Sequence, residues 1–409
     1  MRILISGAGI AGPVLAYWLT RYGYSVTVVE RAETFRKTGG GQAVDLFLPA
    51  LDIIERMGVL AEVRSKATGI ERVTVFKEGT ERPAELSLGN IYSTISDQHV
   101  EIMRDDLAEI FHHATVNDVE YVFGDSITGI SEREEVTFKR GASRRFDLLI
   151  GADGLHSNVR RLVFGDESHF SSFLGGYVAV LSIPDYLDLH GDMLAYLGVG
   201  RIAAAYSGRH MDDARAGFLF RVERPLDYDY RNLARQMELV REAFGDMGGE
   251  VPRWLDELDR TRAFYFDSIT QICMDTWSRG RITLVGDAGY GPGPAVGGGT
   301  SLAIVGAYVL AGELAEAGGD HVRAFAAYER AIGDYVQGCR KLGRRAARTL
   351  MSMGRVQVWG VIQGARLLSR LPTGLARVFA RFGTKTGGLH DSVVLRDYSV
   401  RAARTCDCR

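Results

Sequence analysis

The sequence predicts an α/β protein with a Rossmann-like dinucleotide-binding domain, a second domain built on a β-sheet, and C-terminal helices. Three observations support this fold class. A glycine-rich turn at residues 7–12 separates a strand pattern from a helix pattern, and residues 146–165 and 281–314 each repeat the order strand, turn, helix. Between these two segments, residues 171–270 contain short apolar runs such as "GGYVAVLSI" and "AGFLFRV", which are typical of strands.

The composition is that of a globular chain long enough for two or three domains. The chain has 409 residues, 46% of them hydrophobic and 24% charged, and a net charge of −2 that gives no reason to expect a nucleic-acid partner. The cysteines are too few for a disulfide framework, so we expect a cytoplasmic protein. They are Cys273, Cys339, Cys406 and Cys408. The pair in the terminal "TCDCR" is interpreted as part of a frayed tail, with a metal or redox site as the alternative.

No run of 18 apolar residues predicts a transmembrane span, and no spacing of His and Cys predicts a zinc site. We therefore expect neither a bound metal nor a membrane-spanning segment.

The first motif predicts a dinucleotide site. Gly7, Gly9 and Gly12 form G-x-G-x-x-G between an expected strand at 2–6 and an expected helix at 11–21. Gly7 allows the tight turn, Gly9 allows close approach of a pyrophosphate, and Gly12 allows close packing of helix on strand. The phosphates would lie at the positive end of the helix dipole, beside Ile10 and Ala11. A plain tight turn between strand and helix is the alternative.

The next expected strand, residues 25–30, ends in an acidic residue. Glu30 follows Gly12 by 18 positions and would accept hydrogen bonds from a ribose hydroxyl, while Arg31 could cover the adenine. A second near-match, "GVGRIA" at 198–203, has no helix after it and predicts a β-hairpin instead. We therefore expect one dinucleotide domain.

The second and third motifs show the same order of an expected strand, a turn or loop, and an expected helix. In "FDLLIGADGLHSNVRRLVFG", Asp153 and Gly154 form a turn and Ser157 can cap the following helix. In the third motif an expected strand at 281–285 leads into Gly286 and Asp287, a loop rich in glycine and proline, and an expected helix at 301–314.

Together these motifs resemble the single-component (class A) FAD-dependent aromatic hydroxylases, the class of para-hydroxybenzoate hydroxylase. "DGLHSNVR" resembles the family's D-G-x-x-S-x-V-R motif, and "GDAGYGPGPAVGGG" resembles its G-D motif. Arg104 in "MRDDL" is similar to the family's FAD-contacting arginine. Asp45 in "GGGQAVDL" is similar to a stretch of the tetracycline-inactivating flavin monooxygenases. The resemblance implies a GR2-type Rossmann-like FAD-binding domain, a β-sheet substrate domain, and a monomer or homodimer.

The resemblance assigns seventeen residues to FAD. They are Gly7, Gly9, Ile10, Ala11, Gly12, Glu30, Arg31, Asp45, Arg104, Asp153, Gly286, Asp287, Pro294, Gly297, Gly298, Gly299 and Thr300. The flavin ring is expected against residues 291–299, where any side chain at the three consecutive glycines would push it away. The N-terminus of the next helix would hold the negative charge of the reduced ring. A flexible surface turn is the alternative for this loop.

The chain also departs from the family pattern. Gly289 and Tyr290 stand where the family has Ala-His, and Thr300 and Ser301 replace a region that contains Asn, so any catalytic role of those family residues is in doubt here. A base that ionises a phenol has candidates by residue type only, and a structural role is the alternative for each. They are Tyr290, His99, His210, Tyr177, Tyr196 and Tyr206. The catalytic residues are therefore left unassigned.

Domain bounds follow from the order of the motifs. We expect a discontinuous FAD-binding domain over 1–72, 97–170 and 271–338, a substrate domain over 73–96 and 171–270, and basic C-terminal helices and a tail over 339–409. Residues 340–388 include eleven basic residues and no acidic ones. Three interpretations are open: a packed cap with a charged outer face, a collar that attracts anionic substrate or NADPH, or peripheral membrane contact.

The activity implied by the resemblance is hydroxylation of an aromatic, phenolic or polycyclic polyketide-like substrate, with NAD(P)H and O2 as co-substrates. In this family, reduced FAD and O2 form a flavin C4a-hydroperoxide, and the protein supplies orientation and a dry cavity. Arg36 and Lys37 could contact the nicotinamide cofactor's phosphates, with a solvated basic pair as the alternative. Rival functions are a flavin-dependent oxidase or dehydrogenase, a non-catalytic flavoprotein that sequesters a ligand, and an NAD-linked dehydrogenase.

Overall fold

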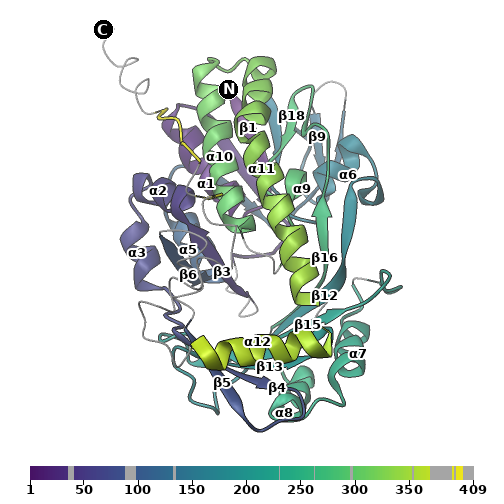
Figure 1. Ribbon diagram of the computed structural model, residues 1–409. Helices are drawn as coiled ribbons and strands as arrows, with labels where there is room; N and C mark the ends of the chain where they lie inside the picture. The colour runs from purple at the N-terminus through teal and green to yellow at the C-terminus, as the bar shows by residue number, and fades with distance from the viewer. Residues whose placement is uncertain are drawn as a thin grey trace.

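The computed structural model of the chain describes residues 1–35, 41–87, 98–131, 135–229, 231–261, 263–294, 298–351, 354–368, 389–390 and 393–398. In these residues two large sheets form two layers of the molecule, the first in the upper part of Figure 1 and the second in the lower part. Helices α10 and α11 pack side by side along the first part, and α11 reaches down toward the second.

The first sheet has six strands in the order β17-β18-β11-β1-β2-β7. All neighbours are parallel except β17 and β18, so the carboxyl ends of β1, β2, β11 and β18 lie at one edge. The strands are β1 (Arg2–Ser6), β2 (Ser25–Glu30), β7 (Glu120–Phe123), β11 (Leu148–Gly151), β17 (Ser278–Arg279) and β18 (Ile282–Leu284). The first three motifs of the sequence each follow one of these central strands, which brings them together at that edge.

Within the described residues, several shorter helices and two small sheets belong to the same region. The helices are α1 (Ala11–Arg21), α2 (Leu48–Arg56), α3 (Leu60–Ser65), α5 (Arg104–His113), α6 (Asn158–Phe164) and α9 (Asp287–Tyr290). One small sheet pairs β3 (Ala43–Phe47) with β6 (His99–Met103), and the other has β8 (Ile127–Ile130), β9 (Glu135–Phe138) and β10 (Arg144–Arg145).

Helix α10 (Gly299–Glu316) is the buried axis of this part of the molecule. Every residue from Ser301 to Leu314 is buried, which explains why the sequence of this helix is apolar all round. It packs against α1, α2 and α11 (His321–Met351).

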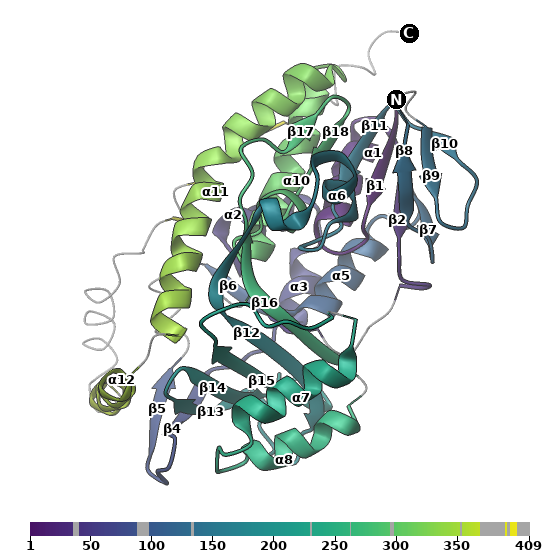
Figure 2. The ribbon, with the colours of Figure 1, turned by 90° about the vertical axis from the view of Figure 1, so that its right-hand side faces the viewer.

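The second sheet has seven strands in the order β16-β12-β15-β14-β13-β4-β5, antiparallel except for β13 and β4. They are β4 (Arg72–Lys77), β5 (Pro83–Ser87), β12 (Ser171–Pro184), β13 (Asp192–Gly198), β14 (Arg201–Tyr206), β15 (Asp213–Arg221) and β16 (Phe264–Ile272). Alternate residues of these strands pack on α7 (Leu233–Phe244) and α8 (Val251–Asp256), where they form a second core around Trp254. Two 3₁₀ turns, η1 (Glu167–His169) and η2 (Glu257–Asp259), border the sheet. Figure 2 shows α7 and α8 on the side of the sheet away from the first layer.

The opposite face of this sheet meets the last two long helices. Ala347 near the end of α11 packs on Val178 and Val180, and α12 (Arg355–Leu368) packs Val358 and Ile362 on β4 and β13. Figure 1 shows α12 lying across this sheet.

The main elements agree with the sequence-based predictions. The strand at 2–6, the helix at 11–21 and the strand at 25–30 have the predicted bounds, and "GVGRIA" forms the predicted hairpin of β13 and β14. The third helix begins two residues earlier and ends two residues later than predicted. The boundary predicted between residues 338 and 339 falls inside α11, which continues unbroken to Met351. The division into domains stays a prediction.

Candidate functional site

The dinucleotide turn has the close contacts predicted for its glycines. Gly7 has φ +109° and donates its N–H to the Val29 carbonyl at 2.8 Å. A Cβ at Gly12 would lie 2.0 Å from the Gly7 carbonyl oxygen, so the helix packs on the turn at a distance that only glycine permits. Ile10 is the residue before α1 and Ala11 is its first residue, as expected for the amides that would face a phosphate.

Glu30 holds this turn against the end of β2. Its carboxylate accepts hydrogen bonds from the Ala8 N–H at 2.8 Å and from the Ala32 N–H at 2.9 Å. The side chain is half-buried, while that of Arg31 is exposed. The predicted roles of Glu30 on a ribose and of Arg31 on an adenine stay predictions.

Arg104 and Asp287 approach the same turn from two other motifs. A Cβ at Gly9 would lie 3.6 Å from Nη2 of Arg104, the first residue of α5. Asp287 begins α9, and its side chain is accessible to solvent although protein atoms surround it closely. Displacement of water by the surrounding protein raises the pKa of Asp287, and the positive charge of Arg104 partly offsets this. Among the described residues, the Asp287 carboxylate has no hydrogen-bond partner.

The second motif is joined to the third by a buried arginine. The carboxylate of Asp153 accepts hydrogen bonds from the N–H groups of Asn158 and Val159 at the start of α6. Arg160 on that helix is 0% exposed and donates to the Ala288 carbonyl of α9 at 2.8 Å and to Glu167 at 2.5 Å. Asp153 therefore supports α6 within the protein, and its predicted contact with the cofactor stays a prediction.

The loop of the third motif is fixed from behind by the end of β16. The Ile272 N–H donates to the Gly291 carbonyl at 2.9 Å, and Nε2 of the fully buried Gln271 donates to the Pro292 carbonyl at 2.8 Å. Gly286, with φ +67°, packs between α1 and α10, where a Cβ would lie 3.4 Å from Ala11. The backbone of the loop is therefore held by contacts from β16, α1 and α10, and not by the loop's own side chains.

The loop ends at a left-handed glycine. Gly298 has φ +82° and precedes the first turn of α10, which starts at Gly299 and Thr300. Pro294 and Thr300 are half-buried. Gly297 lies outside the described residues, as do Arg36, Lys37, Cys406 and Cys408.

Asp45 lies on β3, next to the N-terminal turn of α10. Its Oδ1 is 2.8 Å from Nε2 of His99 on the paired strand β6. Ser301 accepts a hydrogen bond from the Phe47 N–H at 3.0 Å and donates one to the Asp45 carbonyl at 3.3 Å. The serine therefore anchors α10 to β3, which is a role that the sequence did not reveal.

The candidate bases all have polar contacts with other protein groups. The hydroxyls of Tyr177, Tyr196 and Tyr206 accept from backbone N–H groups, and the Tyr290 hydroxyl bonds to Tyr328 in the core. His210 lies 3.5 Å from Asp106. These contacts agree with the structural alternative, and the catalytic residues stay unassigned.

Part of the C-terminal segment returns to the loop of the third motif. His390 is 0% exposed, stacks on Phe47 with ring centroids 4.2 Å apart, and lies 2.7 Å from the Tyr335 hydroxyl. A Cβ at Gly298 would lie 3.0 Å from this imidazole. The sequence offered no signal for this contact, because it joins residues more than 90 positions apart.

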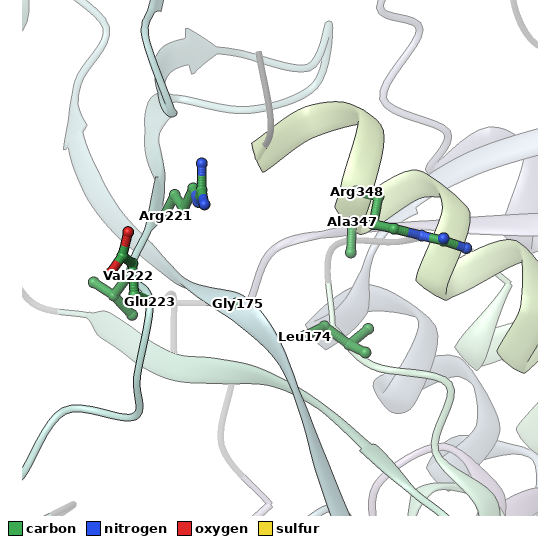
Figure 3. A pocket seen from close by; sticks show the side chains of 7 residues that line it. All are labelled: Leu174, Gly175, Arg221, Val222, Glu223, Ala347 and Arg348. Atoms are coloured by element: carbon green, nitrogen blue, oxygen red, sulfur yellow. The ribbon is translucent and has the colours of Figure 1, made fainter. Parts of the chain in front are cut away.

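A separate hollow of about 360 Å³ lies between the end of α11 and the second sheet. Figure 3 shows Arg221 on the sheet side and Arg348 on the helix side, with Leu174 and Ala347 between them. None of the predicted cofactor residues lines it, so it is distinct from the dinucleotide site. Within the described ranges no cluster of His, Cys, Asp or Glu could hold a metal ion, and no helix is long and apolar enough to cross a membrane.

Comparison with known proteins identifies the family. The model of the FAD binding domain family matches residues 1–347. The chain belongs to this family. A flavin-dependent monooxygenase of Legionella longbeachae is 38% identical over 346 residues, with 84% of this chain and 88% of the relative covered. An uncharacterized protein of Mycobacterium tuberculosis is 42% identical over 339 residues, with 82% of this chain and 90% of the relative covered.

The similarity extends to solved structures. The tetracycline destructase Tet(51) has a TM-score of 0.79 and 32% sequence identity, and the alignment covers 97% of this chain and 99% of that one. The protein is therefore a flavin-dependent monooxygenase of the FAD binding domain family, with FAD as its cofactor. This confirms the predicted family and fold class.

The residues present fit FAD. The turn at Gly7–Gly12 excludes side chains, the solvent-accessible carboxylate of Asp287 has no partner among the described residues, and Arg104 supplies a positive charge beside both. Sequence reasoning missed Gln271, Glu167 and His390, which support the site from other elements.

Proposed function

We propose that the protein hydroxylates an electron-rich aromatic or polycyclic, polyketide-like substrate, with NAD(P)H as the reductant and O2 as the oxidant. The observation that carries this proposal is the convergence of three motifs at one edge of the parallel sheet, next to the face of a second sheet opposite α7 and α8. The similarity to the tetracycline destructase Tet(51) over nearly the whole chain supports a polycyclic substrate.

In this proposal the three motifs hold FAD. The amides of Ile10 and Ala11 bind the pyrophosphate with Arg104, Glu30 binds a ribose hydroxyl, and Asp287 binds the ribityl chain. The backbone of residues 291–299 and the N-terminus of α10 hold the ring and favour negative charge on it. FAD supplies the activation of oxygen, and the chain supplies orientation and exclusion of water.

The substrate is placed on the face of the second sheet that looks toward the FAD-binding motifs. Arg215 on β15 and Tyr206 on β14 offer polar groups on this face, and Met193 and Met211 pack with Tyr206. Flexible methionines suit a large apolar ring system.

Incubation with NADPH, labelled O2 and a panel of phenols and polyketides tests the proposal. We expect one labelled oxygen atom in the product of a substrate that speeds NADPH oxidation. Oxidised product without label would show an oxidase or dehydrogenase, and tight binding without NADPH consumption would show a sequestering flavoprotein. A colourless protein that cannot take up FAD would contradict the proposal altogether.

A further inference from the structure

Three arginines are buried in the described residues, and one of them has no carboxylate partner there, although the thiol of Cys273 lies close enough to interact with its charge. Arg160 is paired with Glu167 at 2.5 Å and Arg215 with Asp213 at 2.7 Å. Arg340 is 3% exposed, yet within the described parts of the chain no carboxylate lies within 4.0 Å of it. A buried charge without a partner is strongly unfavourable, so buried arginines are normally paired.

Arg340 lies directly behind the loop of the third motif. Its guanidinium donates to the carbonyl of Ile272, whose N–H donates to Gly291. Its own carbonyl accepts from Gln271, whose amide also holds Pro292. On the same helix, Sγ of the neighbouring Cys339 lies 4.0 Å from the position that a Cβ at Gly298 would occupy.

The remaining hydrogen bonds of Arg340 do not supply a negative charge. The guanidinium contacts a neutral carbonyl, and its Nε has no hydrogen-bond partner among the described residues. One helical turn further along α11, Arg344 donates to the Gln271 side chain, which adds a second cation and no anion. Residues 340–388 contain no acidic residue at all.

We propose that Arg340 acts on the cofactor through its charge, which is balanced by the negative charge of the reduced FAD on the other side of the loop. This rests on the proposed placement of the flavin ring against residues 291–299. When FAD takes up two electrons and one proton, the ring becomes an anion. A cation held in the protein interior stabilises that form and has little effect on the neutral oxidised form. The arginine therefore raises the reduction potential of the bound flavin.

The experiment is a midpoint-potential measurement on the FAD-loaded protein, by equilibration with a reference dye during slow enzymatic reduction. Arg340→Gln keeps an N–H donor for the Ile272 carbonyl but removes the charge, and Arg340→Lys keeps the charge. Arg348→Gln is the matched control, because Arg348 lies two turns further along α11 and is exposed. In Arg340→Gln we expect reduced FAD to bind about tenfold more weakly relative to oxidised FAD, the effect of one full charge at low effective dielectric constant. Tenfold corresponds to a potential about 30 mV lower for a two-electron couple.

Arg340→Lys and Arg348→Gln are expected to keep the wild-type potential. If Arg340→Gln does not fold, Arg340→Met tests the same charge, and its potential is compared with that of Arg340→Lys. An unchanged potential in a folded neutral variant overturns the inference, since only a structural role would remain. Wild-type protein that binds no FAD would instead overturn the proposed function on which the inference rests.

Discussion

At the scale of single residues, the site depends on two kinds of position. At one kind there is no room for a side chain, and at the other the folded protein makes ionisation of a side chain unfavourable. Gly12 is the clearest case of exclusion, because the Gly7 carbonyl occupies the space that a methyl group would need. Asp287 is the clearest case of cost, because the protein raises its pKa and offers its carboxylate no hydrogen bond within the described chain. Close packing of α1 on the turn explains the first feature, and a ligand that contacts the carboxylate explains the second.

Gly12→Ala is expected to abolish FAD binding and to destabilise the apoprotein. A Cβ 2.0 Å from the Gly7 oxygen forces α1 away from β1, and overpacking of this kind costs about 3 kcal/mol or more in the free energy of unfolding. Denaturant unfolding and FAD titration measure the two effects. Gly333→Ala on α11 is the control: no atom lies within 4 Å of its added Cβ, so we expect a stability gain of up to about 1 kcal/mol. Equal behaviour of the two variants would contradict this account of Gly12.

Asp287→Asn is expected to weaken FAD binding without lowering the stability of the apoprotein. Loss of a charge-assisted hydrogen bond would weaken FAD binding by about tenfold or more. The apoprotein should be as stable as wild type or more stable, because a raised carboxyl pKa means that ionisation opposes folding. That penalty is absent at low pH and grows as pH rises above about 4, the ordinary aspartate value. An apoprotein variant clearly less stable than wild type at pH 7 would show that Asp287 has a structural role instead.

At the scale of elements, distant segments meet behind the cofactor motifs. The loop before α6 contacts the second sheet through His156, whose Nδ1 lies 2.9 Å from Glu167 and whose Nε2 lies 3.4 Å from Asp267 on β16. The C-terminal residues 393–398 pack on α10, where Tyr398 fits against Gly312 and donates to Glu313 at 2.7 Å. These contacts fix how the elements around the site lie relative to one another.

His156→Gln is expected to destabilise the protein at neutral pH but not at high pH. The carboxylates of Asp267 and Glu167 raise the pKa of His156 to about 10. A raised histidine pKa stabilises the fold fully below the unfolded value of about 6.5, and this contribution is lost as pH rises toward 10. Because the side chain is partly exposed, we expect a difference from wild type of about 1 kcal/mol at pH 6. Urea unfolding at pH 6 and at pH 10 measures it, and a difference that persists at pH 10 would contradict the ion-pair explanation.

Tyr398→Ala tests the packing of the C-terminal segment. The side chain is 2% exposed, and loss of a large buried side chain together with its hydrogen bond should cost about 3 to 5 kcal/mol in the free energy of unfolding. Val394→Ala is the control, since this side chain is 94% exposed and should change stability by less than about 0.5 kcal/mol. If the two variants have the same unfolding midpoint, the segment does not contribute to the fold as described.

At the scale of the whole molecule, the sequence predicts the parts that depend on local pattern. The bounds of β1, α1 and β2 follow from strand and helix periodicity around a turn of required glycines, and the motifs identified the family. Contacts across long sequence separations could not be predicted in this way. Gln271 on Pro292, Arg160 on Ala288 and His390 beside Gly298 depend on how elements pack, and no local pattern records that.

The role of the basic C-terminal segment likewise could not be predicted from the local sequence pattern. Its charge alone left a packed cap, an electrostatic collar and a membrane contact open. The structure shows that Arg340 is buried and that Arg366 donates to the carbonyls of Arg82 and Pro83, so two of these cations belong to packing contacts. An electrostatic collar and a membrane contact would both involve the outer surface of the segment, and both stay predictions.

The proposed hydroxylation is tested most directly by NADPH and NADH oxidation with the purified yellow protein, measured with and without each candidate substrate while H2O2 is monitored. We expect one electron-rich polycyclic or phenolic compound to speed oxidation at least about tenfold, the scale on which a bound ligand commonly shifts a coupled step, with little H2O2 released. Oxidation that no compound accelerates, or that returns all electrons as H2O2, would contradict the claim that this site is a substrate-controlled monooxygenase.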